Sequence, residues 1–336
     1  MNPIVSVALP VYNGERFLFE AVSSVFAQSL SDFELIIVDD GSTDRTPAII
    51  SRFAQSDTRV RVIRNDTNKG IIPSLNSGIE TARAPFIARM DADDRMHPER
   101  LAEQVAFLEK NTDIDVVSCL VEKFSETGIR EGYSAYMQWL NSLCTHEDMR
   151  REMFVESPIA HPSVMMRTGT LRCAGGYQDH GWPEDYDLWL RLLRSGVRFG
   201  KVRKVLHYWR DRQDRLSRVD DRYSLINFHR CKAHYLAGLI KKNSGKVVIW
   251  GAKRKSRQFS SLLKPYGIEF AAYVDVDRKI IGTHRDGIPV IAPEGLRDYS
   301  GYPVVCYVSA DGARRKIRDF LVRAGYTESV DFFMLT

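Results

Sequence analysis

The sequence lacks any apolar run that approaches the roughly 20 residues needed to cross a bilayer. Its first residues, MNPIVSVALPVYNGE, lack a basic leader followed by a long apolar core, so we expect no signal peptide. The five cysteines are scattered without the spacing of a metal site, which suits a reducing cytoplasm. These absences predict a cytoplasmic protein with no transmembrane segment, and they leave peripheral association with the inner face of the membrane open.

The composition is that of an ordinary globular protein, with 44% apolar and 27% charged residues, and the 336 residues are enough for two domains. The formal net charge of +5 is unevenly placed: residues 241–336 hold 17 basic and 10 acidic side chains, while the remainder is slightly acidic. A basic tail suggests an anionic partner, such as a nucleic acid, a phosphorylated lipid or a membrane surface. The alternative is a solvated surface without a partner.

Strands and helices alternate in the front half. Short apolar stretches at residues 4–9, 33–38, 60–64 and 86–88 predict buried strands, and we expect Pro10 to end the first. The residues between them have helical spacing, for example at 15–28 and 72–82. This alternation predicts an α/β fold with a mainly parallel sheet and helices on both faces. Ligands bind beyond the carboxyl ends of the strands in such sheets.

The fourth predicted strand ends in three carboxylates, Asp91, Asp93 and Asp94, with only Ala92 between them. Carboxylates packed this closely repel one another unless a cation lies among them. Hard cations such as Mg²⁺ or Mn²⁺ prefer oxygen ligands and commonly bind through one or two carboxylates plus substrate phosphates. The sequence therefore predicts a metal–diphosphate site here. A solvated acidic turn is the alternative, since Asp is common in turns.

Polar turns also follow the first two predicted strands, at Tyr12-Asn13 and Asp39-Asp40. Because the carboxyl ends of parallel strands meet at one edge of a sheet, we expect these turns to converge with the carboxylates. That edge offers what a nucleotide diphosphate needs: an Asp for the base or ribose, an aromatic or a proline beside the base, and a metal for the phosphates. Lys69 adds a charge near phosphate or is a plain surface lysine.

The stretches VSVALPVYNGERFLFEAVSSVFAQSLSDFELIIVDDGSTD, NKGIIPSLNSGI and FIARMDADD strongly resemble the family 2 glycosyltransferases. The similarity is dense to about residue 95 and resumes at residues 159–217. It implies an inverting, metal-dependent enzyme of the GT-A fold that uses a nucleotide-sugar donor. It also implies that Asp40 reads the base, that Asp93 holds the metal, and that Asp91 lies near ribose and metal. The nucleotide-sugar-binding residues expected on this basis are Pro10, Tyr12, Asn13, Asp40, Lys69, Asp91, His161 and Arg212.

The stretch GYQDHGWPEDYDLWLRLLRSG predicts a helix that starts near Pro183, with Glu184 and Asp185 in its first turn and exposed. An inverting transfer needs one general base to deprotonate the acceptor hydroxyl. The resemblance implies that Asp185 is this base, and we interpret Glu184 as an orienting or acceptor-binding residue. A helix-capping role for these carboxylates is the structural alternative. His161 corresponds to a histidine that relatives carry near the donor phosphates or metal, although a lone histidine is more often structural.

The sequence departs from the family pattern after this helix. Many relatives place a histidine soon after a Tyr-Arg pair, whereas here the run HYWRDRQDRLSR contains Arg210, Asp211 and Arg212 instead. The third metal ligand therefore stays open. These arginines would grip the donor phosphates as a mobile loop, or bind an anionic acceptor.

The predicted domains are a catalytic domain at 1–218, a helical linker at 219–244 and a small Rossmann-like domain at 245–336. In the last of these, Gly251 remains from a glycine fingerprint, but Lys253, Arg254 and Lys255 follow it. Their side chains would block close approach of a pyrophosphate to the backbone, which argues against dinucleotide binding and an oxidoreductase. We interpret this domain as a degenerate scaffold or as an acceptor-docking module.

The two-part layout is also similar to that of animal transferases that glycosylate queuosine in tRNA. This motivates a hypothesis in which the basic residues 253–257 and Arg314, Arg315, Lys316 and Arg318 contact RNA phosphates. The sequence thus predicts a hexosyl- or N-acetylhexosaminyltransferase that uses a UDP-sugar, with Mn²⁺ or Mg²⁺, and a saccharide or lipid-linked saccharide acceptor in surface polysaccharide synthesis. The alternative is an RNA-binding protein or a tRNA-nucleoside glycosyltransferase.

Overall fold

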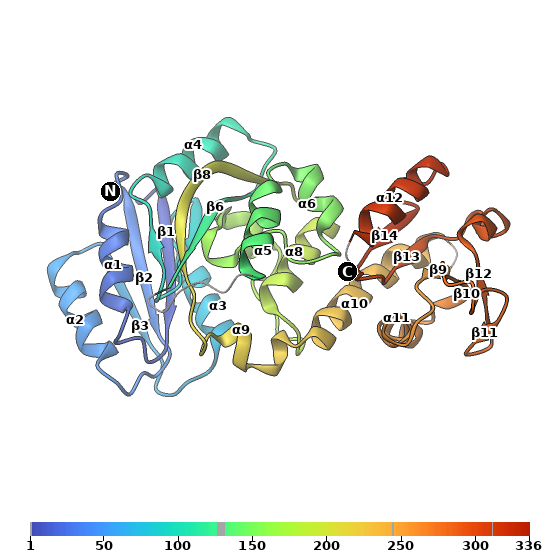
Figure 1. The fold of residues 1–336 in the computed structure, drawn as a ribbon. Helices are drawn as coiled ribbons and strands as arrows, with labels where there is room; N and C mark the ends of the chain where they lie inside the picture. Colours follow the sequence, from blue (N-terminus) through green and yellow to red (C-terminus); the bar gives the residue numbers. More distant parts are fainter. Residues whose placement is uncertain (1, 126–131, 244, 311) are drawn as a thin grey trace. The chain divides into compact units, whose positions relative to one another are not determined.

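The computed structural model describes residues 2–125, 132–243, 245–310 and 312–336. The chain divides into two compact units (Figure 1). Unit 1 consists of Met1–Met149, Pro158–His180 and Asp187–Val219. Unit 2 consists of Arg150–Ser157, Gly181–Tyr186 and Asp220–Thr336. Two short segments that precede Asp220 in the sequence therefore belong with the C-terminal unit.

In its described part, unit 1 has an eight-stranded sheet with the strand order β3-β2-β1-β4-β7-β6-β8-β5. The first four strands are parallel, as the alternation of strands and helices predicts. Strand β7 is antiparallel to both of its neighbours, and β6 and β8 are parallel to each other. The strands are β1 (Val5–Val11), β2 (Phe33–Asp39), β3 (Val60–Arg64), β4 (Phe86–Arg89), β5 (Arg95–Met96), β6 (Val116–Phe124), β7 (Met165–Arg167) and β8 (Phe199–Arg210).

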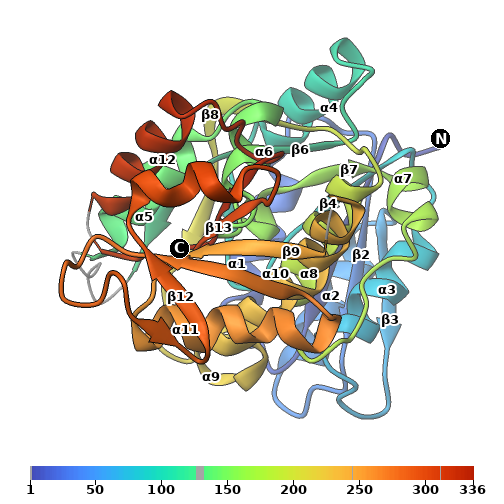
Figure 2. The same ribbon diagram turned by 90° about the vertical axis from the view of Figure 1, so that its right-hand side faces the viewer.

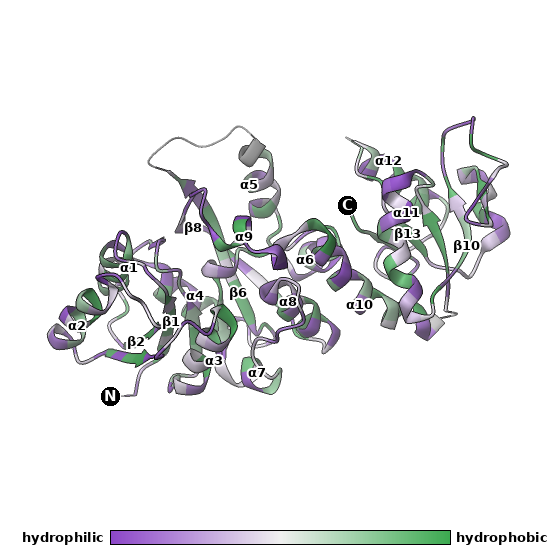
Figure 3. Cartoon of the chain, turned by 90° about the horizontal axis from the view of Figure 1, so that it is seen from below, coloured by the Kyte–Doolittle hydropathy of each residue, from purple (hydrophilic) through white to green (hydrophobic). Residues whose placement is uncertain are grey.

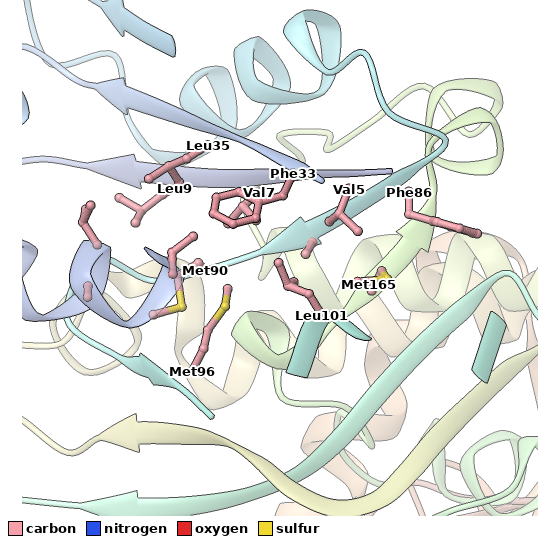
Figure 4. Close-up of a cluster of buried hydrophobic side chains, with 14 of the residues drawn as sticks. Val5, Val7, Leu9, Phe33, Leu35, Phe86, Met90, Met96, Leu101 and Met165 are labelled. Atoms are coloured by element: carbon pink, nitrogen blue, oxygen red, sulfur yellow. The ribbon is translucent and has the colours of Figure 1, made fainter. Parts of the chain in front are cut away.

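Helices pack on this sheet through buried apolar residues, for example Leu18, Ala21, Val22 and Val25 of the first helix. Strands β1 and β2 are buried along their whole length, which explains their continuous apolar sequences. Figure 4 shows part of the core, where Val7 and Leu9 of β1 lie close to Met90, which follows β4. The helices are α1 (Leu18–Phe26), α2 (Thr46–Ser56), α3 (Ile71–Thr81), α4 (Arg100–Lys110), α5 (Gly132–Ser142), α6 (His146–Glu152), α7 (Thr168–Cys173), α8 (Glu184–Arg194), α9 (Leu216–Val219) and the 3₁₀ turn η1 (His161–Ser163). The end of α6 and the start of α8 belong to unit 2.

Two details of unit 1 differ from the sequence-based expectations. Pro10 does not end the first strand, because β1 continues to Val11 with Pro10 paired to Val38. A proline lacks only the N–H donor, so it is tolerated near the end of a strand. The twelve-residue strand β8 was not predicted, because its lysines and arginines interrupt the apolar pattern.

Unit 2 has a six-stranded sheet in its described part, with the order β11-β12-β10-β9-β13-β14. Five of these strands are parallel, and β11 is an antiparallel edge. Figure 2 shows α11 and α12 on opposite sides of the strands. The strands are β9 (Lys246–Trp250), β10 (Glu269–Val274), β11 (His284–Arg285), β12 (Ile288–Ile291), β13 (Val304–Cys306) and β14 (Phe332–Met334). The helices are η2 (Asp221–Tyr223), α10 (Leu225–Asn243), α11 (Arg254–Ser260), η3 (Ser261–Tyr266), η4 (Pro293–Tyr299) and α12 (Ala313–Arg323).

This unit is a small Rossmann-like module, and its strands are among the most apolar parts of the chain (Figure 3). A single helix was expected over 220–242, but the short turn η2 precedes α10 there. The helix expected at 258–263 begins earlier, at Arg254, so Arg254 and Lys255 lie in its first turn and Lys253 is its N-cap residue. Residue 244, where the linker was expected to end, lies outside the described residues.

In the ranges that the structure describes, we find no helix that combines the length and the apolar character of a membrane span.

Two glycines of unit 1 provide a test of how its turns pack. Gly41 and Gly70 both have positive φ angles, of 74° and 92°. A Cβ at Gly41 would lie 2.6 Å from the backbone carbon of Thr67, whereas one at Gly70 would meet nothing within 4 Å. Gly70, with φ 92° and ψ 171°, lies in a region of backbone conformation that essentially only glycine adopts, so we expect Gly70→Ala to cost about 2 kcal/mol of unfolding free energy through backbone strain alone. Gly41→Ala adds overpacking against the Thr67 backbone to its own strain and should cost roughly 4 kcal/mol.

Urea unfolding of both variants, followed by circular dichroism, measures the difference. Equal losses in the two variants would contradict the close approach between the turns after β2 and β3.

Candidate functional site

The polar turns of unit 1 meet at the carboxyl edge of the sheet. Strand β1 lies between β2 and β4, and the chain order reverses between β1 and β4. Such a switch point is where open α/β sheets leave a crevice for ligands. In the register of the sheet, Val11 pairs with Asp39 at this edge. The turns after β1, β2 and β4 therefore carry the predicted site residues to one place.

Asn13 joins the first two turns. Its N–H donates to Ser42 Oγ at 2.9 Å, and its side-chain oxygen accepts the N–H of Thr43 at 2.9 Å. Its φ of 48° is in the left-handed region that Asn tolerates better than most residues. Asn13 thus connects the turns after β1 and β2. The neighbouring Tyr12 is 49% exposed, so its side chain is accessible to a ligand.

The Asp40 carboxylate, which was predicted to bind the base, already accepts several hydrogen bonds within the protein. It is 4% exposed, and its carboxylate accepts bonds from Asn65 Nδ2 (2.7 Å) and the N–H groups of Lys69 (2.9 Å) and Gly70 (2.8 Å). A carboxylate has about four lone-pair positions, so roughly one acceptor position remains for a ligand. Asp40 therefore shapes the turn before α3, and the Lys69 side chain on that turn is exposed.

The acidic cluster lies directly after β4. One carboxylate oxygen from each of Asp91, Asp93 and Asp94 falls within 4.8 Å of the others. Burial and repulsion by its two neighbours raise the pKa of Asp93 to about 7, and burial and Asp91 raise the pKa of Asp94 to about 7. Burial opposes ionisation of Asp91 as well, but the Arg89 guanidinium, which forms an ion pair with it, lowers its pKa.

Asp94 is turned into the protein. Its two oxygens accept bonds from His207 Nε2 and from the N–H of Arg210, both at 2.8 Å. Arg100, which is fully buried, donates to His207 Nδ1 at 2.9 Å. An arginine can only donate, so the ring proton of His207 is on Nε2 and points to Asp94. Arg100 and His207 were not among the predicted site residues, because nothing in the sequence of α4 or β8 indicates that these two side chains meet.

The residues present fit a divalent cation. Asp91 uses Oδ1 for Arg89, and Asp93 uses Oδ2 for an ion pair with Arg212 at 2.9 Å. Asp91 Oδ2 and Asp93 Oδ1 remain as oxygen ligands of the kind that Mg²⁺ and Mn²⁺ prefer. In the stretch where relatives were expected to supply a histidine, this chain has Arg212, and its guanidinium forms an ion pair with Asp93. Arg212 is the predicted phosphate-binding residue that the structure brings to the metal motif.

His161 is held away from solvent rather than presented to a ligand. Its Nε2 lies 2.7 Å from the Tyr177 hydroxyl, and its ring packs edge-on against Trp189. Burial lowers the pKa of His161 well below its usual range, so the ring is neutral. The surroundings of His161 in unit 1 favour the structural alternative.

Glu184 and Asp185 begin α8, as predicted, but they differ in burial. The expectation that both are exposed is wrong for Glu184, which is 2% exposed. The Tyr223 hydroxyl donates to this carboxylate and lies 2.8 and 2.7 Å from its two oxygens, and the Arg222 guanidinium lies 3.8 Å away. Asp185 is half-buried, and its Oδ1 accepts the N–H of Tyr186 at 2.8 Å. Asp185 is therefore the more accessible carboxylate of the pair.

Comparison with known proteins identifies the family and related sequences. The family model described as Glycosyl transferase family 2 matches residues 6–173. The chain is 36% identical over 230 residues to EpsE of Bacillus subtilis (strain 168), which is described as a glycosyltransferase, covering 67% of this chain and 80% of that protein. It is 29% identical over 205 residues to the amylovoran biosynthesis glycosyltransferase AmsE of Erwinia amylovora, covering 60% and 74%.

Solved structures resemble the chain in fold. S. aureus TarS 1–349 in complex with UDP-GlcNAc superposes with a TM-score of 0.57 at 19% identity, covering 78% of this chain and 71% of that one. The mannosyltransferase PcManGT from Pyrobaculum calidifontis, in complex with GDP-Man and Mn²⁺, gives a TM-score of 0.52 at 18% identity, covering 72% and 64%. The family match ends before Glu184, so it does not include the carboxylate pair at the start of α8.

The different partners of Asp93 and Asp94 lead to a prediction. Asp93→Asn removes a ligand oxygen and should weaken Mn²⁺ binding at least tenfold while leaving stability nearly unchanged. Asp94→Asn keeps one acceptor but leaves a buried donor unsatisfied, which should cost about 1–3 kcal/mol of unfolding free energy. Electron paramagnetic resonance titration of Mn²⁺, with urea unfolding of the metal-free protein, measures both. Normal Mn²⁺ affinity in Asp93→Asn would disprove the metal assignment.

Proposed function

The chain belongs to glycosyl transferase family 2, and we propose that it transfers a sugar from a UDP-sugar to an acceptor hydroxyl with inversion at the anomeric carbon. Unit 1 has the GT-A fold that this chemistry uses. The observation that carries the proposal is the placement of Asp91 and Asp93 at the switch point of the sheet, each with one oxygen left for a cation. The turns after β1 and β2 supply the neighbouring surface for the nucleotide.

In this proposal Asp91 and Asp93 hold Mn²⁺ or Mg²⁺. The bound ion supplies charge stabilisation for the leaving diphosphate. Arg212 forms an ion pair with Asp93, and a guanidinium can bind a phosphate through two hydrogen bonds. We therefore propose that Arg212 binds the donor phosphates. Tyr12 covers the base, and Asp40 accepts one bond from the nucleotide through its remaining acceptor position.

We assign the general base to Asp185. It is the accessible member of the pair at the start of α8, and a carboxylate there can accept the acceptor hydroxyl proton as that oxygen attacks the sugar. Glu184 holds the first turn of α8 in place, because its buried carboxylate is hydrogen-bonded to Tyr223 of η2. Its burial leaves no surface for direct acceptor contact, so we assign it an orienting role.

For the acceptor we propose a saccharide or a lipid-linked saccharide in surface polysaccharide synthesis. The sugar would be transferred to it at the cytoplasmic face of a membrane. The similarity to AmsE, named for amylovoran biosynthesis, supports this class. The RNA alternative is less favoured, because two residues of its basic cluster are already engaged. Arg318 contacts Glu328 and Glu152, and Arg314 lies 3.7 Å from Glu152.

The donor is tested by measuring UDP and GDP release from a panel of nucleotide sugars, with Mn²⁺, with Mg²⁺ and with chelator. We expect metal-dependent release from one UDP-hexose or UDP-N-acetylhexosamine, because hydrolysis of the donor needs the same leaving-group stabilisation as transfer. Asp93→Asn is the matched control for background hydrolysis. Release that is unaffected by chelator, or that occurs only with GDP-sugars, would overturn the metal or the UDP assignment.

The base is tested with Asp185→Asn. We expect a fall in kcat of roughly 10²–10⁴-fold, because general-base assistance is lost, with the Kd for UDP and Mn²⁺ unchanged. Asp179→Asn, a change at an exposed aspartate six residues earlier, should keep full transfer. Full activity of Asp185→Asn would remove Asp185 from the mechanism.

A further inference from the structure

Unit 2 has its own switch point, and a pocket lies there. Strand β9 is flanked by β10 and β13, and the chain order reverses between β9 and β13. A cavity of about 440 Å³ opens beyond the carboxyl ends of these three strands. This volume is within the range of about 300–1,000 Å³ typical of small-molecule sites. No role in the proposed transfer reaction is assigned to it.

The inner wall of the pocket is aromatic and rigid. Trp250, Phe259 and Tyr307 line it, and all three are buried. The ring of Phe259 is stacked on His229 of α10 with 3.8 Å between centroids, which fixes the wall from behind. An apolar surface of this kind suits the flat body of a ligand such as a nucleobase.

The floor of the pocket is preformed by hydrogen bonds. Asp275, at the end of β10, accepts the N–H of Ala252 at 3.1 Å and that of Asp277 at 3.0 Å. Ser256 Oγ donates to the Tyr307 carbonyl at 2.7 Å. A Cβ on Gly251 would lie 2.6 Å from Ser256 Oγ, so only glycine allows this packing. The Asp275 carboxylate is thus engaged in holding the turn.

The rim of the pocket is basic. Lys253, Lys255 and Lys316 line it and are exposed, whereas Asp275 is the one acidic side chain among the lining residues that the structure describes. Lys253 has a loose ion pair with Asp277 at 3.7 Å, and its side chain remains 72% exposed. Three ammonium groups around an aromatic wall favour a ligand that carries negative charge at one end and a flat apolar body at the other.

We propose that this pocket binds a nucleoside phosphate, with its phosphates held by Lys253, Lys255 and Lys316 and its base against the aromatic wall. Recognition here is by side chains. The glycines that would let a pyrophosphate approach the backbone are replaced by Lys253, Arg254 and Lys255, and this favours a mononucleotide over a dinucleotide. The proposal is independent of the sugar transfer assigned above to Asp91, Asp93 and Asp185, none of which lines this pocket.

Isothermal titration calorimetry of the full chain tests the proposal. The titrations use the Asp93→Asn variant with chelator present, which weakens nucleotide binding at the metal motif of unit 1. The heat of binding that is still measured then comes from unit 2. The probes are AMP, UMP, ADP, UDP, inorganic pyrophosphate and a single-stranded RNA. We expect saturable binding of one nucleotide per chain that weakens with salt, and weaker binding of pyrophosphate, which has no base to stack.

The double variant Lys253→Glu/Lys316→Glu should lose binding by at least about tenfold, because charge-assisted bonds to phosphate are removed. Lys279→Glu changes an exposed lysine of the same unit that does not line the pocket, and should bind as before. Circular dichroism melting checks that the variants fold. Loss of binding in Lys279→Glu as well, equal affinity for pyrophosphate, or binding of RNA alone would overturn the proposal. So would the absence of any nucleotide binding.

Discussion

The buried contact between Asp94 and His207 is the constraint on which the acidic turn depends. Three carboxylates within a few ångströms of one another repel, and this turn offers them little water. Arg100 orients His207, His207 and the backbone of Arg210 satisfy Asp94, and Arg89 compensates Asp91. One carboxylate is thereby fixed in the protein, so the other two can face a ligand.

The order of the strands converts this local arrangement into a site. Because β1 lies between β2 and β4, the turns after all three strands emerge at one edge. Asn13 and Gly41 then lock the neighbouring turns together, through hydrogen bonds in one case and close backbone approach in the other. The backbone of these turns therefore determines the shape of the surface proposed to bind the nucleotide, and a few side chains supply its charges.

Unit 2 uses the same sheet geometry with opposite charge. Its switch point carries lysines where unit 1 carries aspartates, and its aspartate is engaged by backbone N–H groups. In unit 1 a cation has to mediate between carboxylates and phosphate, whereas in unit 2 lysines can meet phosphate directly. The uneven charge along the sequence thus corresponds to two different ways of handling an anionic ligand.

The sequence by itself determined the parallel sheet, the turns at its carboxyl edge and the acidic cluster after β4, because periodicity and turn chemistry are local. It did not determine the partners of those side chains. The buried carboxylate of Glu184 accepts a hydrogen bond from the Tyr223 hydroxyl, 39 residues later in the chain, and Asp94 is satisfied by His207, 113 residues away. Such pairings exist only after distant elements pack, and only the tertiary structure could decide which carboxylates remain free for a ligand.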